Sequence, residues 1–231
     1  MRLLSGYGWQ AVSVRYVIGA DSRARVTQSC QNAPCLQLCS SKRMKLIDRW
    51  LQSWREHKVR AWLRPGARVL DIGCHQGEFL ERLGGSIRES VGLDPLAQPR
   101  ETDSFVLKAV PFAEPLDFPA GRFNAITLLA TLEHIRDKAP LAREARRLLS
   151  PGGRLIMTVP SPRVDDIVHT LVRLGLADGM SLEEHHGFKP ADTGPIFTAA
   201  GLELEHHSSF QLGLNHLFVF RRSDNEGPSS K

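Results

Sequence analysis

The 231-residue sequence predicts an α/β fold with a doubly wound, mixed sheet of about seven strands, mostly parallel and ending in a C-terminal antiparallel hairpin. Three observations lead to this prediction. From residue 65 onward, short apolar stretches alternate with helical patterns, as in sheets whose strands are joined by crossover helices. Residues 69–83 have the pattern of a buried strand, a glycine turn and a helix. Residues 202–208 and 214–222 are too close in sequence for a parallel crossover, so they are expected to pair as a hairpin.

The other elements are expected from local patterns of apolar residues. The first helix is predicted from residue 45 to 63, where Trp50, Trp54 and Trp62 belong to an apolar stripe and Pro65-Gly66 ends the pattern. Strands are predicted over residues 68–72, 90–93, 105–109, 123–129 and 154–159, and further helices over residues 138–149, 167–176 and 192–200.

The pattern of apolar residues divides the chain into a regularly patterned domain, residues 44–222, and two ends without such a pattern. Residues 1–43 lack sustained periodicity and are expected to form a poorly structured extension, and the polar residues 223–231 a disordered tail. The extension is either an arginine-rich targeting segment or sequence upstream of the true start at Met44. We favour the second interpretation, because no signal-peptide core is present and Met44 directly precedes the first well-patterned helix.

The net charge of +5 does not indicate a nucleic-acid groove. Six of the 30 basic residues but only one of the 25 acidic residues lie in residues 1–43, which leaves 24 of each in the rest of the chain. Nucleic acid is therefore disfavoured as a partner. No apolar run is long enough to span a bilayer. The sequence does not specify an oligomeric state.

Three of the four cysteines, Cys30, Cys35 and Cys39, lie in the extension. Their C-x4-C-x3-C spacing is not a familiar zinc pattern, and a disulfide framework is typical of small secreted domains rather than of a chain this long. We interpret these cysteines as incidental. A reducing, cytoplasmic location fits this composition.

Ligands of open parallel sheets bind beyond the carboxyl ends of the strands, where the strand order reverses. Four segments are predicted to reach that edge. The first is the glycine turn Asp71-Ile72-Gly73-Cys74-His75-Gln76-Gly77, and the second is Asp94, 17 residues after Gly77, at the end of a predicted strand. The third is Leu-Glu-His-Ile at residues 132–135, and the fourth is Ser150-Pro151-Gly152-Gly153.

The glycine turn differs from a nicotinamide site. Such a site requires G-x-G-x-x-G with an acidic residue about 20 residues later. Here an aspartate, Asp71, ends the strand itself, where its carboxylate can anchor the loop or meet a cationic ligand. Glycines at 73 and 77 permit positive φ angles and the close approach of a ligand to the backbone. Taken alone, the turn also fits a purely structural strand-to-helix connection.

In this order the four segments resemble the motifs of the class I S-adenosylmethionine-dependent methyltransferases, whose first motif is D/E-x-G-x-G-x-G. The likeness covers about residues 65–222 and is greatest to the ubiquinone- and menaquinone-type methyltransferases. It implies a Rossmann-like sheet with a C-terminal hairpin and S-adenosyl-L-methionine as the cofactor. His75 stands where the family commonly has its middle glycine, which is tolerable because histidine is among the residues enriched in left-handed conformations.

The resemblance also implies roles for single residues. Asp71 would orient the turn or hold the methionine ammonium group, and Asp94 would bind the ribose hydroxyls. The backbone around Gly73 and Gly77 would lie against the methionine portion. The remaining cofactor contacts are expected from Cys74, His75, Pro95, Phe112, Ala113 and Leu129.

Two departures from the family pattern concern the adenine end. The segment that is often D-A-x-x-L-P-F in the family is Phe112-Ala113-Glu114-Pro115-Leu116-Asp117-Phe118 here, so Phe112 replaces the acid that often contacts the adenine amine. Adenine can instead stack on an aromatic ring or bond to the backbone. The aspartate that usually opens strand four is Asn124, which we interpret as structural.

His134 is the candidate catalytic base. It is expected beside the methyl group, and a neutral imidazole can accept a proton near neutral pH. The alternative is that Glu133-His134 only begins the helix after strand four. Some quinone O-methyltransferases bind a divalent metal through E-x-x-E-H, but Ala130 occupies the first position here, so no metal is predicted.

We therefore predict methyl transfer to a small, partly apolar acceptor, with O-, N- and C-methylation left open. The acceptor pocket is expected in the insert 160–191, whose apolar residues suit such a molecule, and His185 or His186 is a candidate to face the substrate there. Two alternatives stay open. One is a non-catalytic domain that binds S-adenosylmethionine, and the other, less favoured, is a nicotinamide-dependent oxidoreductase.

Overall fold

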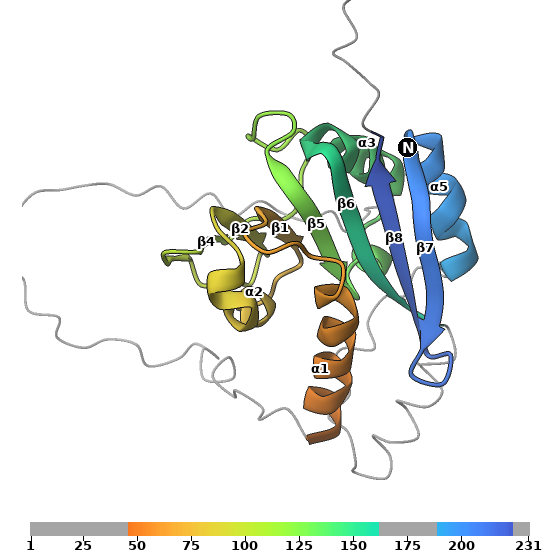
Figure 1. Cartoon of the computed structure of the whole chain (residues 1–231), viewed down its shortest axis with the longest axis horizontal. Helices are drawn as coiled ribbons and strands as arrows, with labels where there is room; N and C mark the ends of the chain where they lie inside the picture. Colours follow the sequence, from red (N-terminus) through yellow and green to blue (C-terminus); the bar gives the residue numbers. More distant parts are fainter. Residues whose placement is uncertain (1–45, 162–188, 224–231) are drawn as a thin grey trace, which may run out of the picture. The chain divides into compact units, whose positions relative to one another are not determined.

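A computed structural model describes residues 46–161 and 189–223 of the chain (Figure 1). The expected extension 1–43, the expected helix 167–176, the histidines at 185 and 186, and all but the first residue of the expected tail lie outside these residues.

The centre of the fold is an eight-stranded mixed sheet with the order β3-β4-β2-β1-β5-β6-β8-β7. Strands β4, β2, β1, β5 and β6 run parallel, whereas β8 is antiparallel to β6 and β7 is antiparallel to β8. The predicted fold class and C-terminal hairpin are thus confirmed. The strands are β1 (Val69–Ile72), β2 (Ser90–Leu93), β3 (Arg100–Glu101), β4 (Phe105–Lys108), β5 (Phe123–Leu129), β6 (Leu149–Pro160), β7 (Leu202–Phe210) and β8 (Asn215–Arg222).

The strand order reverses at β1. Leu70 of β1 is paired with Val91 of β2 on one side and with Ile126 of β5 on the other. The chain first builds the sheet outward through β2 and β4, then returns to add β5 and β6 on the opposite side of β1. The loops after β1 and β5 therefore diverge at one edge, which is where such sheets bind ligands.

Two features of the sheet differ from the prediction. Strand β3, which pairs antiparallel with β4, was not expected, because two exposed residues carry no apolar pattern. Strand β6 begins at Leu149 rather than at Arg154, because Leu149 already pairs with Phe123, and the register shifts before Arg154 pairs with Ala125. The segment of residues 150–153 therefore lies beside the start of β5, and the prediction that it reaches the edge formed by the carboxyl ends of the strands is wrong.

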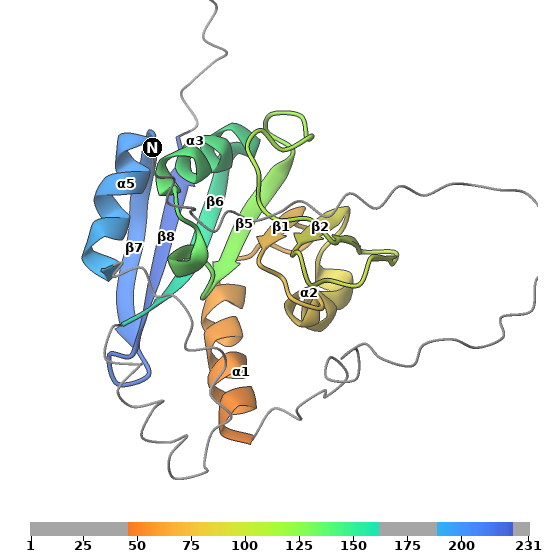
Figure 2. The ribbon, with the colours of Figure 1, turned by 180° about the vertical axis from the view of Figure 1, so that it is seen from behind.

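Helices cover the two faces of the sheet (Figures 1 and 2). On one face, α2 (Glu78–Leu83) buries Phe79, Leu80 and Leu83 in a core that also contains Val59 of α1 (Leu46–Arg60). On the other face, α3 (Lys138–Leu148) and α5 (Thr193–Ala199) enclose a second core. Short 3₁₀ turns follow α2 (η1, Gly84–Ser86), follow β5 (η2, Leu132–His134) and precede α5 (η3, Pro190–Asp192).

Helix α1 lies at the end of the sheet toward which β5 and β6 point (Figure 1). Arg82 of α2 donates hydrogen bonds to both carboxylate oxygens of the buried Glu56, and Gln211 Nε2 donates to the Leu51 carbonyl oxygen at 2.8 Å. The predicted tryptophan stripe is only partly buried: Trp54 packs against the core, but Trp50 is 60% exposed and contacts the Trp54 ring edge-on. No helix of the described residues is long and apolar enough to cross a membrane.

Candidate functional site

The glycine turn leaves β1 at the switch point and is held by the backbone of β2. The Gly73 and Cys74 amides donate to the Leu93 carbonyl oxygen at 2.8 and 3.3 Å, and the Gly77 amide donates to the Cys74 carbonyl oxygen at 2.8 Å. The chain then enters α2. These bonds bring the first two predicted segments, the glycine turn and the end of β2, to one edge of the sheet.

The glycines at 73 and 77 are required by packing as well as by backbone conformation. Gly73 has φ +78°, and a Cβ there would lie 2.3 Å from Thr131 Oγ1. Gly77 has φ +84°, and a Cβ there would lie 2.8 Å from a methyl group of Leu107. The turn therefore packs tightly between the loop after β5 and strand β4, and a side chain at position 73 or 77 would clash with one of them.

His75 adopts the left-handed conformation that its position in the motif requires, with φ 49°. Its side chain is 63% exposed, and its Nδ1 lies 2.9 Å from Glu78 Oε1. The ring thus points away from the backbone of the turn. A residue other than glycine fits here because the side chain extends into solvent, away from the backbone of the turn.

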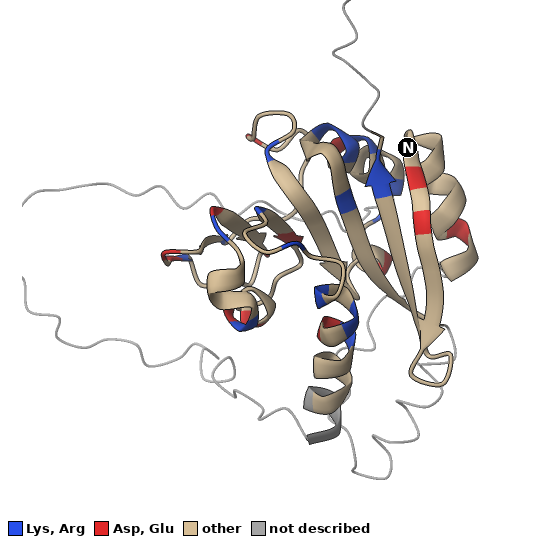
Figure 3. Ribbon diagram, in the orientation of Figure 1, with Lys and Arg blue, Asp and Glu red and all other residues tan. Residues whose placement is uncertain are grey.

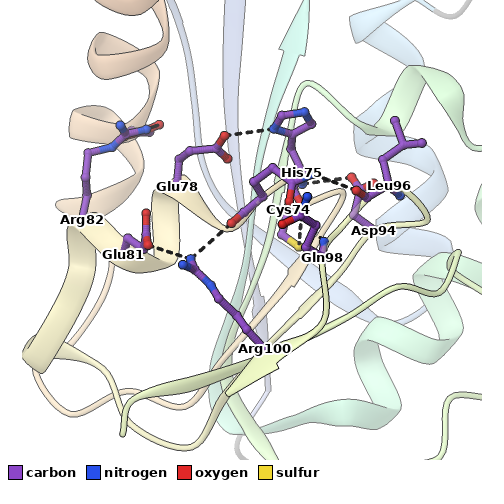
Figure 4. A network of polar contacts seen from close by, with 11 residues as sticks. Cys74, His75, Glu78, Glu81, Arg82, Asp94, Leu96, Gln98 and Arg100 are labelled. Atoms are coloured by element: carbon purple, nitrogen blue, oxygen red, sulfur yellow. Dashed lines mark hydrogen bonds and ion pairs between the residues drawn. The ribbon is translucent and has the colours of Figure 1, made fainter. Parts of the chain in front are cut away.

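Asp94 connects the glycine turn to the loop after β2 (Figure 4). Its Oδ2 accepts a hydrogen bond from the His75 amide at 2.9 Å, and its Oδ1 accepts one from the Leu96 amide at 2.8 Å. A carboxylate has about four acceptor positions, so two remain for a ligand after these bonds are made. Pro95 next to it is exposed.

A second set of contacts, which the sequence patterns did not predict, surrounds the same loop. Gln76 Nε2 donates to the Leu96 carbonyl oxygen at 2.7 Å, and the Gln98 amide donates to Gln76 Oε1 at 3.1 Å. Arg100 of β3 donates to the Gln76 carbonyl oxygen at 3.3 Å and pairs with Glu81 at 2.7 Å (Figure 4). The unexpected strand β3 thus carries the arginine that braces the glycine turn.

The loop after β5 brings the third predicted segment to this edge. Leu129 is half-buried, and Ala130 has φ 55° and donates its amide to the Thr158 carbonyl oxygen at 3.0 Å. His134 ends the 3₁₀ turn η2 and is exposed, whereas its neighbour Glu133 is buried. The His134 side chain therefore lies at the surface of this loop, while Glu133 faces the protein.

The comparisons with known proteins identify the family. Residues 43–207 match the family model described as "Methyltransferase domain". The chain belongs to this methyltransferase family. The predicted class I S-adenosylmethionine-dependent methyltransferase is thereby confirmed as family and fold, and the family implies S-adenosylmethionine as the cofactor.

The chain is similar in sequence to curated methyltransferases. The chain is 35% identical over 115 residues to 27-O-demethylrifamycin SV methyltransferase of Amycolatopsis mediterranei, which covers 43% of this chain and 42% of that protein. It is 32% identical over 162 residues to the ubiquinone biosynthesis O-methyltransferase of Xanthomonas axonopodis, which covers 64% of this chain and 67% of that protein. The match thus spans less than half the length of the rifamycin enzyme.

Solved structures agree on the fold. An S-adenosylmethionine-dependent methyltransferase from Mesorhizobium loti superposes with a TM-score of 0.57 at 19% identity, covering 74% of this chain and 98% of that one. A second from Methanosarcina mazei superposes with a TM-score of 0.53 at 17% identity, covering 72% and 97%. At this identity the likeness concerns the fold alone.

Two predicted cofactor residues of the methyltransferase turn their side chains into the protein. The Cys74 side chain is buried, and its Sγ lies 2.7 Å from where a Cβ on Gly92 would be. Burial also raises the pKa of the Cys74 thiol, so the thiol stays neutral. Only the backbone of Cys74 faces the turn, because the side chain fills the gap that Gly92 leaves.

Asp71 is the second of these residues. It is 2% exposed, and its Oδ1 accepts a hydrogen bond from Thr127 Oγ1 at 2.6 Å. Burial and, to a smaller extent, the nearby carboxylates of Glu56, Asp94 and Glu78 raise the pKa of Asp71 to about 7, against the Thr127 bond, which lowers it. The carboxyl group therefore titrates near neutral pH and has no basic partner among the groups that shift it.

The adenine candidates lie on the segment between β4 and β5. Phe112 is half-buried and packs against the larger core, whereas Ala113 is exposed. Among the described residues, no group of three or more histidine, cysteine, aspartate or glutamate side chains is arranged to hold a metal ion. The absence of a metal stays a prediction.

Arg55 of α1 was missed by the sequence patterns. Burial lowers the pKa of its guanidinium group, and Glu133 and Glu56 oppose that shift by their negative charge. A cation on α1 therefore lies within electrostatic reach of the loop after β5. Its signal in the sequence was weak, because Arg55 appears on the polar side of an amphipathic helix.

The raised pKa of Asp71 predicts a pH-dependent stability. The unfolded carboxyl has a pKa of about 3.9, so between about pH 4 and 7 the folded state binds more protons and stability falls as pH rises. Asp71→Asn, which can still accept the Thr127 bond, should remove this slope. We expect the unfolding free energy of the variant minus that of the wild type, measured by urea titration, to increase across this window by a few kcal/mol. A difference that does not vary with pH would contradict the assignment.

Proposed function

We propose that the protein transfers a methyl group from S-adenosylmethionine to a small, partly apolar acceptor. The methionine portion lies at the glycine turn 71–77, the ribose hydroxyls bond to Asp94, and adenine lies near Pro95, Phe112 and Ala113. Leu129 borders the methyl group, and His134 accepts the proton that the acceptor loses. The atom methylated is left open among oxygen, nitrogen and carbon.

The observation that supports this proposal best is the sign of the charge around the glycine turn. Asp71, Glu78 and Asp94 are close enough for the last two to raise the pKa of the first. Helix α2 also begins with Glu78, whereas Glu81 in the same turn is paired with Arg100. A pyrophosphate would be repelled by these carboxylates, whereas a ligand with an ammonium and a sulfonium group would be attracted. This argues against the nicotinamide alternative.

The acceptor is proposed to lie between the loop after β5 and the turn between β7 and β8. Asn215 is buried, and its Nδ2 donates to Gln211 Oε1 at 2.5 Å, but its Oδ1 accepts no hydrogen bond from the part of the chain that the structure describes. In the sheet β6 lies between β5 and β8, so an acceptor that reaches from the loop after β5 to Asn215 would span two strand spacings, about 10 Å, beyond the end of β6. A hydroxyl or N–H group of the acceptor would complete the bonding of Asn215.

Family membership makes a small-molecule acceptor more reasonable than a macromolecule, and both curated relatives carry names of small-molecule pathways or products. A cytoplasmic location stays a prediction from the cysteine content. The boundaries of the catalytic domain, residues 44–222, are part of the same proposal.

The proposed function is tested by turnover. Wild-type protein incubated with S-adenosylmethionine and a metabolite extract should release S-adenosylhomocysteine, detected by mass spectrometry. His134→Ala should lower this release by at least about a hundredfold, the usual contribution of a general base, with little change in cofactor affinity. Equal release by the variant would remove His134 as the base. Cofactor binding without release from any extract would support the non-catalytic alternative.

Asp94→Ala should weaken S-adenosylmethionine binding by roughly ten- to a hundredfold, since hydrogen bonds to a charged group contribute about 1.5–3 kcal/mol. The affinity is measured by calorimetry and the fold by circular dichroism. Asp103→Ala, which removes an exposed carboxylate from the loop between β3 and β4, is the matched control. Unchanged affinity in a folded Asp94→Ala variant would show that the ribose binds elsewhere.

A further inference from the structure

An ion pair on α3, formed by a buried glutamate and a half-buried arginine, faces the segment that joins β4 to β5. Glu144 is 3% exposed, and its two carboxylate oxygens accept hydrogen bonds from Arg147 Nε at 2.8 Å and from its terminal nitrogen at 2.7 Å. The bond from Arg147 lowers the pKa of Glu144 more than burial raises it. The pair is therefore ionised, and its bidentate geometry fixes both side chains.

Both members of the pair bond to the backbone of the β4–β5 segment. The Leu116 amide donates to Glu144 Oε1 at 2.8 Å. Arg147 donates to the carbonyl oxygens of Leu116 at 3.0 Å and of Phe118 at 2.8 Å. One ion pair thus bonds to three backbone groups of two residues, Leu116 and Phe118, so its loss would free all three groups at once.

Further contacts of α3 reach the residues that are candidates to contact adenine. Arg143, on the preceding turn of α3, pairs with Glu114 at 3.7 Å, and Phe112 and Leu116 pack against the core that α3 covers. Helix α3 is rich in basic residues (Figure 3). Among them, Arg147 bonds to the backbone of the segment, and Arg143 pairs with its carboxylate at Glu114. Side chains of α3 therefore contact the segment from residue 118 back to residue 114, which directly follows Phe112 and Ala113 in the sequence.

We propose that the Glu144–Arg147 pair is a positioning element for the adenine wall of the cofactor site. It holds residues 112–118 in place before the ligand arrives, which reduces the ordering cost of binding. The ligand class is any compound with an adenosyl group. This inference rests on the proposed function, because it assumes that adenine lies against Phe112 and Ala113.

The test is calorimetry of Glu144→Gln with two probes, S-adenosylhomocysteine and 5′-methylthioadenosine, which shares the adenosyl group but lacks the amino acid. A glutamine cannot form the bidentate ionic pair, so the segment should loosen. We expect both probes to bind about tenfold more weakly, the effect of losing one charge-assisted hydrogen bond. An equal loss for the two probes assigns the effect to the adenosyl end.

Glu205→Gln is the matched control, because Glu205 forms the same bidentate pair with Arg154, at 2.7 Å for both bonds, on strands β7 and β6 away from the segment. Its probe affinities should stay within about twofold of the wild type. Arg143→Ala, at an exposed position, is the second test should Glu144→Gln not fold, and it should weaken both probes in the same direction.

Two results would overturn the inference. One is a folded Glu144→Gln protein with a lower melting temperature but unchanged probe affinities, since the pair would then only stabilise the fold. The other is a loss for S-adenosylhomocysteine alone. Failure of the wild type to bind either probe would instead contradict the proposed function, so the two failures are distinguishable.

Discussion

The carboxylate of Asp94 is shared by the two loops that follow β1 and β2, and the candidate site depends on it. The carboxylate accepts hydrogen bonds from the amides of His75 and Leu96. These bonds hold the glycine turn in its left-handed conformation and place the loop after β2 beside the turn. The backbone of the turn is thus arranged by the protein itself. The acceptor positions that remain on the carboxylate are directed to the same edge, where a ribose would complete them.

Packing and buried charge also constrain the glycine turn. Thr131 and Leu107 occupy the space that side chains at 73 and 77 would need, so the turn is enclosed between β5 and β4. Asp71 is buried beneath the turn among carboxylates, which is costly for its charged form. A cationic ligand would relieve part of that cost. Function and stability are therefore coupled at Asp71 in this proposal: the residue proposed to favour the cofactor also weakens the fold near neutral pH.

Much of the fold was predictable from local patterns, because apolar periodicity and glycine turns are local properties. Strand β5 was predicted with its bounds, and the hairpin of β7 and β8 followed from the short link between them. Strand β3 escaped prediction because Arg100 and Glu101 are exposed and have no pattern. Trp50 was assigned to the apolar stripe of the first helix, but its side chain is mostly exposed.

The site was less predictable, because burial and pairing depend on residues distant in sequence. The motif located Asp71, but not its partner Thr127, which is 56 residues away. It located Cys74, but not the inward direction of the thiol, which follows from the space over Gly92. Glu144 and Arg147 read as ordinary helix surface until the β4–β5 segment is placed against them.

The central claim is that the glycine turn at 71–77 binds a methyl donor rather than a dinucleotide. The most direct measurement is calorimetry of the full chain with S-adenosylmethionine and, separately, with NAD. The acidic surroundings of the turn predict binding of S-adenosylmethionine and none of NAD. Binding of NAD without binding of S-adenosylmethionine would contradict the account.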